Sequence, residues 1–121
     1  MSERSLTLYH FTCDDHGYPG IVRSGTLVPR QHPLMPVLGP LLWLTDLADP
    51  PTPESVGLTS QNLKCDRLAK RLTVKSTAVT PWSAVREKAP KEVVGWLESL
   101  GQPEHWWVAR RPLTRSEFTL P

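Results

Sequence analysis

The sequence predicts a single domain of mixed α and β structure, the α+β class. Residues 6–12 and 67–75 alternate between apolar and polar side chains, which is typical of strands that bury one face. Residues 91–100 carry apolar side chains at helical spacing, which predicts an amphipathic helix. The chain has 121 residues, a length that suits one domain over residues 1–121.

The first predicted strand covers residues 6–12 and separates its side chains into two sets. Because successive side chains on a strand point to opposite faces, Tyr9 and Phe11 share one face. Leu8 and His10 share the other face. The two faces of this strand are therefore expected to meet different parts of the domain.

Four further elements follow before the middle of the chain. Residues 20–24 predict a short helix, and Gly25 is placed as its left-handed stop. The chain has 13 prolines, and their cluster within residues 29–53 predicts a loop with little helix. Residues 41–45 predict a buried strand, and residues 53–58 predict one helical turn.

The C-terminal part predicts the longest helix and a further strand. The helix over residues 91–100 is expected to stop at Gly101. Residues 105–109 predict a strand on which Trp106 and Trp107 face opposite sides. One of these indoles is expected in the core, and the other needs a helix, a ligand or a partner to cover it.

Composition and charge exclude several classes of protein. The formal charge of +2 is too small to indicate a nucleic-acid-binding protein by itself. No apolar run is long enough to cross a bilayer, and no secretory leader is recognisable at the N-terminus, so no membrane partner and a cytoplasmic location are expected. The sequence contains no phosphate-binding P-loop, no dinucleotide fingerprint and no nucleophile elbow.

A zinc site is one interpretation of the segment from His10 to His16. His10, Cys13 and His16 are residue types that zinc accepts, and Cys65 is the other cysteine of the chain. However, His10 and Cys13 are expected on opposite sides of the strand. A structural or incidental role is therefore favoured, and no metal site is predicted.

Three motifs in order resemble those of a known enzyme superfamily. Residues 9–12 read Tyr-His-Phe-Thr, and residues 21–29 read Ile-Val-Arg-Ser-Gly-Thr-Leu-Val-Pro. Residues 42–47 read Leu-Trp-Leu-Thr-Asp-Leu, and Glu104 precedes a late strand. The series resembles small ADP-ribosyltransferase-like domains, a superfamily that includes rifamycin- and DNA-modifying ADP-ribosyltransferases and RNA 2′-phosphotransferases. The motifs cover the first third of the chain well and its end loosely.

The resemblance implies a fold and an activity. It implies two small mixed or antiparallel sheets that form a cleft, flanked by short helices. NAD would be the cofactor, consumed as a substrate, and ADP-ribose would pass to a protein, nucleic acid or small-molecule acceptor that the sequence does not identify.

The resemblance also implies roles for particular residues. His10 would bind a ribose hydroxyl, Trp43 would stack on nicotinamide, and Glu104 would stabilise the cationic sugar. The expected NAD-binding set is Tyr9, His10, Thr12, Arg23, Trp43 and Thr45. The candidates for the diphosphate are Arg23, Arg30, Arg67 and Arg71, because a guanidinium matches phosphate oxygens.

Each of these residues also has a structural interpretation. His10 and Trp43 can be core residues, and Glu104 can be a solvated carboxylate at a strand start. Trp43 stands where the superfamily usually has tyrosine. Glu98 and Glu117 compete with Glu104 for the catalytic position.

Two other functions remain open at the level of sequence. One is transfer of an RNA 2′-phosphate to NAD, which requires several basic residues around the cleft. The other is a non-enzymatic interaction module or inhibitor on the same fold. Arg110, Arg111 and Arg115 form a basic cluster that suits phosphate, an acidic partner or a solvated edge.

Overall fold

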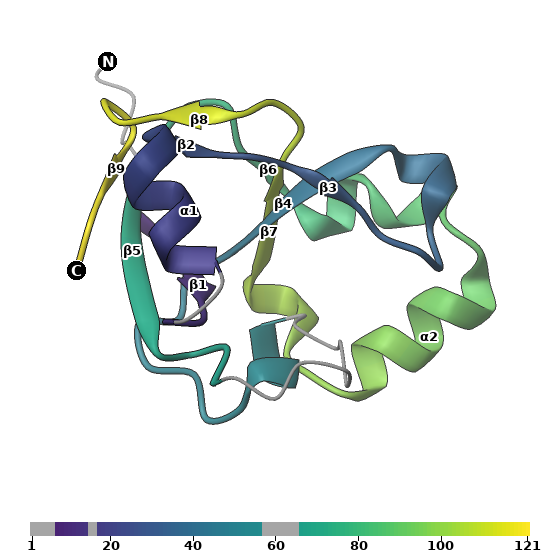
Figure 1. The fold of residues 1–121 in the computed structure, drawn as a ribbon. Helices are drawn as coiled ribbons and strands as arrows, with labels where there is room; N and C mark the ends of the chain where they lie inside the picture. The colour runs from purple at the N-terminus through teal and green to yellow at the C-terminus, as the bar shows by residue number, and fades with distance from the viewer. Residues whose placement is uncertain (1–6, 15–16, 57–65) are drawn as a thin grey trace, which may run out of the picture.

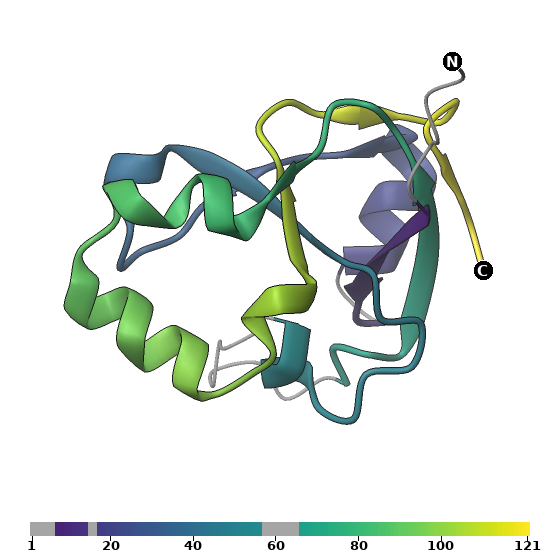
Figure 2. The same cartoon turned by 180° about the vertical axis from the view of Figure 1, so that it is seen from behind.

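The structure, a computed structural model, describes residues 7–14, 17–56 and 66–121. The described residues form a mixed α+β domain with two antiparallel sheets and two α-helices, which confirms the predicted class (Figure 1 and, from behind, Figure 2). The α-helices are α1 (Gly17–Ser24) and α2 (Lys91–Ser99). The strands are β1 (Thr7–Thr12), β2 (Thr26–Leu27), β3 (Arg30–Gln31), β4 (Pro40–Thr45), β5 (Lys70–Lys75), β6 (Thr80–Pro81), β7 (Trp106–Ala109), β8 (Leu113–Thr114) and β9 (Phe118–Thr119). The 3-10 helices are η1 (Pro36–Leu38), η2 (Pro53–Val56), η3 (Trp82–Ala84), η4 (Arg86–Lys88) and η5 (Pro103–His105).

The larger sheet consists of two halves that are joined at one point. Its strand order is β6-β7-β4-β1-β5-β9, with β3 also paired to β4, and β2 and β8 form the second sheet. All six residues of β1 pair with β5, from Thr7 opposite Lys75 to Thr12 opposite Lys70. Between β1 and β4, only Tyr9 and Thr45 pair. The two strands therefore separate beyond that pair.

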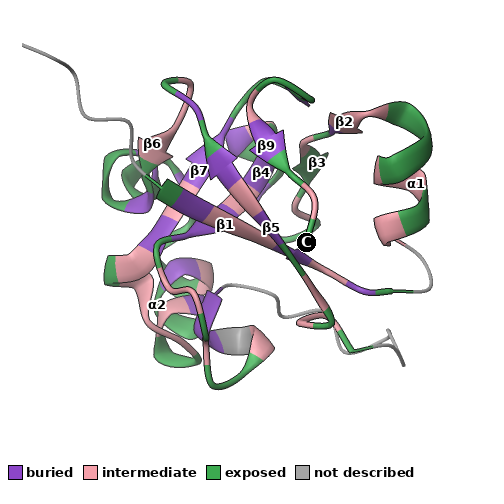
Figure 3. Cartoon of the chain, turned by 90° about the vertical axis from the view of Figure 1, so that its left-hand side faces the viewer, coloured by how far each residue is buried: buried purple, intermediate pink, exposed green. Residues whose placement is uncertain are grey.

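A hydrophobic core lies on each face of the larger sheet. Leu41 belongs to a core with Trp82, Trp106 and residues of α2, whereas its neighbour Leu42 belongs to a core on the side of α1. Such a division follows from the alternation of side chains along β4. Figure 3 shows the buried residues along the central strands and the more exposed character of α1.

Trp106 and Trp107 point to opposite faces of the sheet, as predicted. Trp106 is 1% exposed and packs in the core that contains α2. Trp107 is half-buried and packs against the other core. The cover of Trp107 therefore comes from the α1 side of the sheet, and the 91–100 helix covers its neighbour instead.

The glycine stop was predicted correctly for one helix and wrongly for the other. Gly25 has a φ angle of 67°, and its N–H donates to the carbonyl of Ile21 at 2.8 Å. Among the described residues, Gly25 and Gly39 are the glycines with positive φ, so Gly101 is not a left-handed stop. Instead α2 ends at Ser99, and Leu100 caps it in a right-handed conformation.

The structure differs from the sequence prediction at the start of β5 and within the proline-rich loop. The strand expected from residue 67 begins at Lys70, since residues 66–69 form a turn in which Leu68 N–H donates to the Asp66 carboxylate at 2.9 Å. The proline-rich loop contains β3 and η1, and it buries Met35 and Leu38 in the α2-side core. The described part of the turn expected at residues 53–58 is η2, and residues 57 and 58 lie outside the described residues.

Candidate functional site

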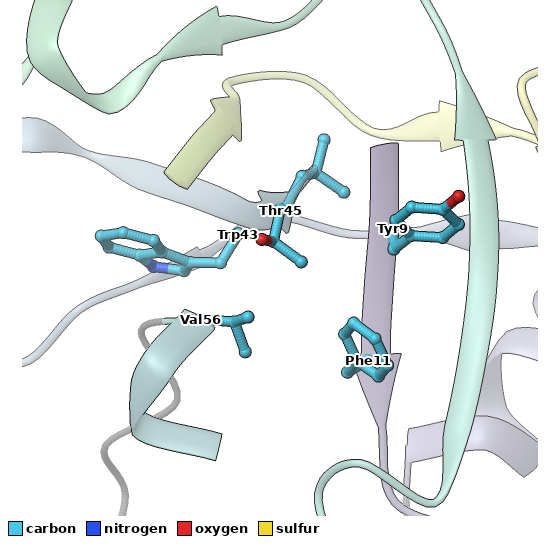
Figure 4. Close-up of a pocket in the computed structure, with 6 residues that line it drawn as sticks. Tyr9, Phe11, Trp43, Thr45 and Val56 are labelled. Atoms are coloured by element: carbon cyan, nitrogen blue, oxygen red, sulfur yellow. The ribbon is translucent and has the colours of Figure 1, made fainter. Parts of the chain in front are cut away.

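A hollow lies where β1 and β4 separate, and it is the candidate functional site (Figure 4). The enclosed space is about 10 Å³, roughly that of one water molecule, and the rest of the hollow is open to solvent. The residues that line this β1–β4 hollow are Tyr9, Phe11, Trp43, Leu44, Thr45 and Val56. Cavities that enclose a drug-sized ligand span roughly 300–1,000 Å³, so the hollow is a shallow depression between the strands and encloses neither a ring system nor a dinucleotide as it stands.

The positions of the lining side chains follow from the alternation of side chains along β1 and β4 and from the single residue pair that joins these two strands. Tyr9 and Phe11 are two residues apart on β1, and Trp43 and Thr45 are two residues apart on β4. Tyr9 pairs with Thr45, so the four side chains lie toward the same face of the sheet. Val56, at the end of η2, points toward the space between the strands (Figure 4).

Trp43 belongs both to the hollow and to the core. Its ring centroid lies 5.1 Å from that of Trp82 and 5.8 Å from that of Trp106, and these two rings are fully buried. The indole extends away from Tyr9 and Phe11 (Figure 4). One wall of the hollow is therefore held by core packing.

His10 lies behind the hollow rather than in its lining. Its neighbours on the same face of the sheet are Leu8 and Leu72, which belong to the α1-side core. Its Nδ1–H donates to the carbonyl oxygen of Trp43, with a distance of 3.0 Å. The imidazole thus bridges β1 and β4 where their backbone pairing has ended.

The protonation of His10 follows from this environment. Burial lowers the pKa of His10 below its ordinary value of 6.5, and the hydrogen bond to the Trp43 carbonyl opposes this effect in part. The ring is therefore neutral at pH 7. With its proton on Nδ1, the Nε2 atom is an acceptor.

The remaining residues of the expected NAD-binding set lie in three different places. Thr12 packs against α1, where a Cβ at Gly17 would lie 1.9 Å from its Oγ1 atom. Arg23 is exposed in the last turn of α1. Thr45 lines the hollow, but its Oγ1 accepts a hydrogen bond from the N–H of Leu47 at 3.1 Å. Of this set, the structure brings Tyr9, Trp43 and Thr45 together.

Among the described residues, no hydrogen bond or ion pair joins Glu104 to His10 or Trp43, and Glu104 does not line the hollow. It lies in η5, before β7 begins at Trp106, and Trp106 pairs with the last residue of β4, Thr45. Its side chain is 66% exposed, and its Oε1 atom lies 3.9 Å from Nε2 of His105. His10 and Trp43 lie on opposite faces of the sheet, and neither His10 nor Glu104 lines the hollow, so the structure does not bring the three residues proposed as catalytic into one lining.

The two carboxylates that compete with Glu104 form hydrogen bonds away from the hollow. Glu98 accepts hydrogen bonds from Trp82 Nε1 at 2.7 Å and from Arg86. Glu117 accepts from Arg111 and Ser76, and these contacts lower its pKa to about 2. Neither carboxylate lines the hollow.

Arg71 is placed at the rim of the hollow. Its guanidinium carbon lies 5.4 Å from the centre of the Tyr9 ring. Its Nη1 atom donates to the carbonyl of Ala48 at 2.9 Å and to the carboxylate of Asp49 at 3.3 Å. Of the other arginines considered for a diphosphate, Arg23 and Arg30 have no such contact with the lining.

Sequence reasoning missed Phe11, Leu44 and Val56 as lining residues. The strand alternation that places Tyr9 on one face also places Phe11 there, so this signal was present. Val56 joins the hollow only through the path of the 46–56 loop, for which the sequence has no local signal.

A second polar group was also missed, at the ends of β4 and β7. His105 Nδ1–H donates to Asp46 Oδ1 at 2.6 Å, and Trp107 Nε1 lies 3.4 Å from Asp46 Oδ2. Asp46 follows Thr45, so these groups tie the strand ends together on the face opposite the hollow.

No metal centre is formed by the part of the chain that the structure describes. Within residues 7–14, 17–56 and 66–121, no three His, Cys, Asp or Glu side chains are placed to hold an ion. Cys13 is buried, whereas His16 and Cys65 lie outside the described residues. Neither α-helix in these ranges has the length and apolar character needed to cross a bilayer.

Comparison with protein families, with characterised proteins and with solved structures finds no match to this chain.

Proposed function

We propose that this domain binds NAD through its nicotinamide end, in an ADP-ribosyltransferase-like arrangement, with the β1–β4 hollow as the ring site. The observation that carries the proposal is the hollow itself. It has aromatic walls, and it lies between the two strands whose motifs resemble the superfamily; a ring would enter as these walls move apart. Aromatic walls favour a planar ring by stacking and edge contacts.

The separation of β1 from β4 also supports recognition of the nicotinamide carboxamide by the backbone of β1. Beyond the Tyr9–Thr45 pair, the edge of β1 that faces β4 has no continuing ladder. Backbone N–H and C=O groups at such an edge need other partners. A nicotinamide carboxamide offers one donor group and one acceptor, so it matches the backbone around Phe11.

Arg71 supplies a polar contact in this proposal, whereas His10 supports the hollow from the opposite face of the sheet through its hydrogen bond to the Trp43 carbonyl. Arg71 would exchange its contact with Asp49 for a diphosphate oxygen, which a guanidinium binds in a bidentate manner. The Arg71–Asp49 pair is exposed, so its loss costs about 1 kcal/mol or less.

Transfer of ADP-ribose needs one group that the hollow lacks. When the C–N glycosidic bond breaks, nicotinamide leaves with the electron pair and the sugar becomes cationic. The acceptor then bonds to the sugar and releases a proton. A nearby carboxylate stabilises the cation, and no carboxylate lines the hollow. The proposal is therefore NAD binding, with transfer depending on a carboxylate that approaches the bound sugar.

Because no carboxylate lines the hollow, a second candidate function is also favoured: a non-enzymatic binding module on this fold. An aromatic hollow without a carboxylate binds a ring without cleaving it. An RNA 2′-phosphotransferase-like activity has less support, because it needs several cations around the cleft and Arg71 is the rim cation with a defined contact.

Calorimetric titration of the full chain with NAD, ADP-ribose and nicotinamide tests the proposal. We expect NAD to bind, and Val56→Trp to abolish binding by filling the hollow. Arg71→Gln should weaken NAD and ADP-ribose by about tenfold and leave nicotinamide unchanged. Lys88→Gln, an exposed lysine in η4, is the matched control. Absence of NAD binding by the folded protein at millimolar concentration overturns the proposal.

Nicotinamide release separates the enzyme from the binding module. Release that depends on Glu104, with NAD affinity retained in Glu104→Gln, supports transfer chemistry. Tight NAD binding without release supports the module.

A further inference from the structure

The strands β1, β5 and β9 bury one face of their sheet and leave the other face open. Leu8, Leu72 and Val74 are buried in the α1-side core. Neighbouring residues of a strand point to opposite faces, and residues that pair across two strands share a face. Tyr9 pairs with Thr73, so both lie on the face that this core does not cover.

Thr73 lies at the centre of this open face. Its cross-strand neighbours are Tyr9 on β1 and Thr119 on β9. Along β5, the nearest residues on the same face are Arg71 and Lys75. The strand register therefore places these side chains on one surface. We call it the β5 face; its residues are Thr7, which pairs with Lys75, and Tyr9, Arg71, Thr73, Lys75 and Thr119.

The β5 face is open to solvent and lacks exposed aliphatic side chains. Four of its residues are exposed, and the other two, Tyr9 and Thr73, are half-buried. The buried centre of a protein–protein interface is more apolar than the rest of the surface, so this face suits a partner that is recognised by charge and stacking instead. The large apolar side chains that the described residues expose lie elsewhere: Val22, Val28, Leu34, Val37, Trp96 and Leu100.

The β5 face carries two cations and no acidic side chain of its own. No ion pair or side-chain hydrogen bond joins Lys75 to another described residue. Arg71 lies 3.3 Å from the carboxylate of Asp49, which is 93% exposed. The backbone carbonyl of Glu117 accepts from the N–H of Lys75, but its carboxylate is paired with Arg111. The face is therefore locally positive.

Tyr9 supplies an aromatic ring between the two strands. The ring extends from β1 toward β5 and away from Trp43 (Figure 4), and the guanidinium carbon of Arg71 lies 5.4 Å from its centre. Bases of single-stranded nucleic acid stack on aromatic rings and on guanidinium planes. At about 3.3 Å per residue, Arg71 and Lys75 lie about 13 Å apart along β5, so one strand of nucleic acid that crosses Thr73 reaches both cations.

We propose that the β5 face binds single-stranded nucleic acid, with phosphates at Arg71 and Lys75 and a base stacked on the Tyr9–Arg71 pair. The threonine hydroxyl groups provide hydrogen bonds to sugar and phosphate oxygens. A duplex fits this surface less well, because its bases are already stacked inside the helix. The inference does not depend on NAD binding, since Thr73, Lys75 and Thr119 lie outside the lining of the hollow.

Fluorescence anisotropy at low salt tests the proposal with a labelled uridine oligonucleotide of about ten nucleotides, a length typical of one single-strand site. The logarithm of the affinity should fall with the logarithm of the salt concentration with a slope of about −1.4, the value for two phosphates. Lys75→Gln should weaken binding about fivefold and reduce the slope to about −0.7. Lys88→Gln, an exposed lysine in η4, is the matched control and should change neither quantity.

Two further variants test the roles of Arg71 and of the ring. Asp49→Asn frees Arg71 from its carboxylate, so it should strengthen binding by about twofold or more. Tyr9→Thr should weaken binding about fivefold, whereas Tyr9→Phe, which keeps the ring, should not. An abasic strand of the same length should bind about fivefold more weakly than the uridine strand and should not respond to Tyr9→Thr.

Failure of the folded wild-type chain to bind the oligonucleotide at low salt overturns the proposal, as does an equal loss in Lys88→Gln. Equal affinity for the abasic strand, or for a glutamate peptide of the same charge, also overturns it, because charge alone would then explain binding. Val56→Trp obstructs the hollow and should leave this binding unchanged; its loss would assign the oligonucleotide to the hollow instead. Thermal melting of each variant confirms that the fold is retained.

Discussion

The imidazole of His10 donates a hydrogen bond to the backbone carbonyl of Trp43 at 3.0 Å, although the two side chains lie on opposite faces of the sheet. The bond crosses the gap that opens after the single pair between β1 and β4. His10 is therefore a structural link between the halves of the sheet, whatever its role toward a ligand. This relationship leads to the first prediction.

Replacing His10 by Ala should lower the free energy of unfolding by about 1–3 kcal/mol. The change removes the donor and leaves the Trp43 carbonyl without its partner. Urea unfolding followed by tryptophan fluorescence measures the effect. His10→Gln, which keeps a donor, should recover part of the loss, and an equally stable His10→Ala variant would contradict the structural role.

Acidification below pH 6.5 should destabilise the domain through its histidines. Burial lowers the pKa of both His10 and His32 from the ordinary value of 6.5. The unfolded chain therefore takes up these protons at a higher pH than the folded chain does. Stability is complete above pH 6.5 and falls as the pH drops through that value toward the lower pKa of the folded state.

Melting temperatures between pH 8 and pH 5 check this dependence. His32 also accepts the N–H of Leu34 at Nδ1, so protonation removes an acceptor from the 32–35 turn. A double variant, His10→Gln with His32→Gln, should show a flatter profile across this range. A wild-type profile that is flat or rises toward pH 5 would rule the mechanism out.

Glu117 should contribute stability that persists to low pH. Hydrogen bonds from Arg111 and Ser76 lower its pKa to about 2. Because the folded pKa lies below that of the unfolded chain, 4.5, the contribution is complete above pH 4.5 and is lost as the pH falls toward 2. At pH 7, Glu117→Gln should cost about 1.5–3 kcal/mol of unfolding free energy.

Arg111→Gln is the companion variant, and the double variant closes a cycle. A coupling free energy near zero between the two positions would contradict the assigned pair. Ser76→Ala removes the second donor to Glu117 and should have a smaller effect, because its hydroxyl is uncharged.

Two glycines of the N-terminal helix region should respond to alanine with opposite signs. Gly25 has a φ of 67°, where an L side chain is strained, so Gly25→Ala should destabilise by about 1 kcal/mol. Gly20 lies within α1 with open space around its Cβ position, so Gly20→Ala should stabilise by about 0.5–1 kcal/mol. Parallel denaturant curves compare the two, and the same sign for both would refute the assigned conformations.

The sequence predicted the helices and strands better than the contacts between them. The alternation of residues 6–12 and the apolar stripe of residues 91–100 are local signals, and β1 and α2 follow them closely. The pairing of Tyr9 with Thr45 and the separation beyond it depend on contacts between segments more than 30 residues apart. Local pattern has no access to that register.

The candidate site shows the same limit. Tyr9, Trp43 and Thr45 were expected together and line one hollow, because two strands with clear alternation form it. Glu104 was placed by motif order alone, and η5 holds it beyond the end of β4. Gly101 carried a stop signal that α2 does not use, since Leu100 already ends the helix in a right-handed conformation.

The division of cores along β4 has a consequence for how this chain can vary. Leu41 serves one core, and Leu42 and Leu44 serve the other. Inserting or deleting a single residue in this strand would send each leucine to the wrong side and disrupt both cores at once. Length changes among relatives of this protein should therefore accumulate in the connections, while the residue count of β4 stays constant.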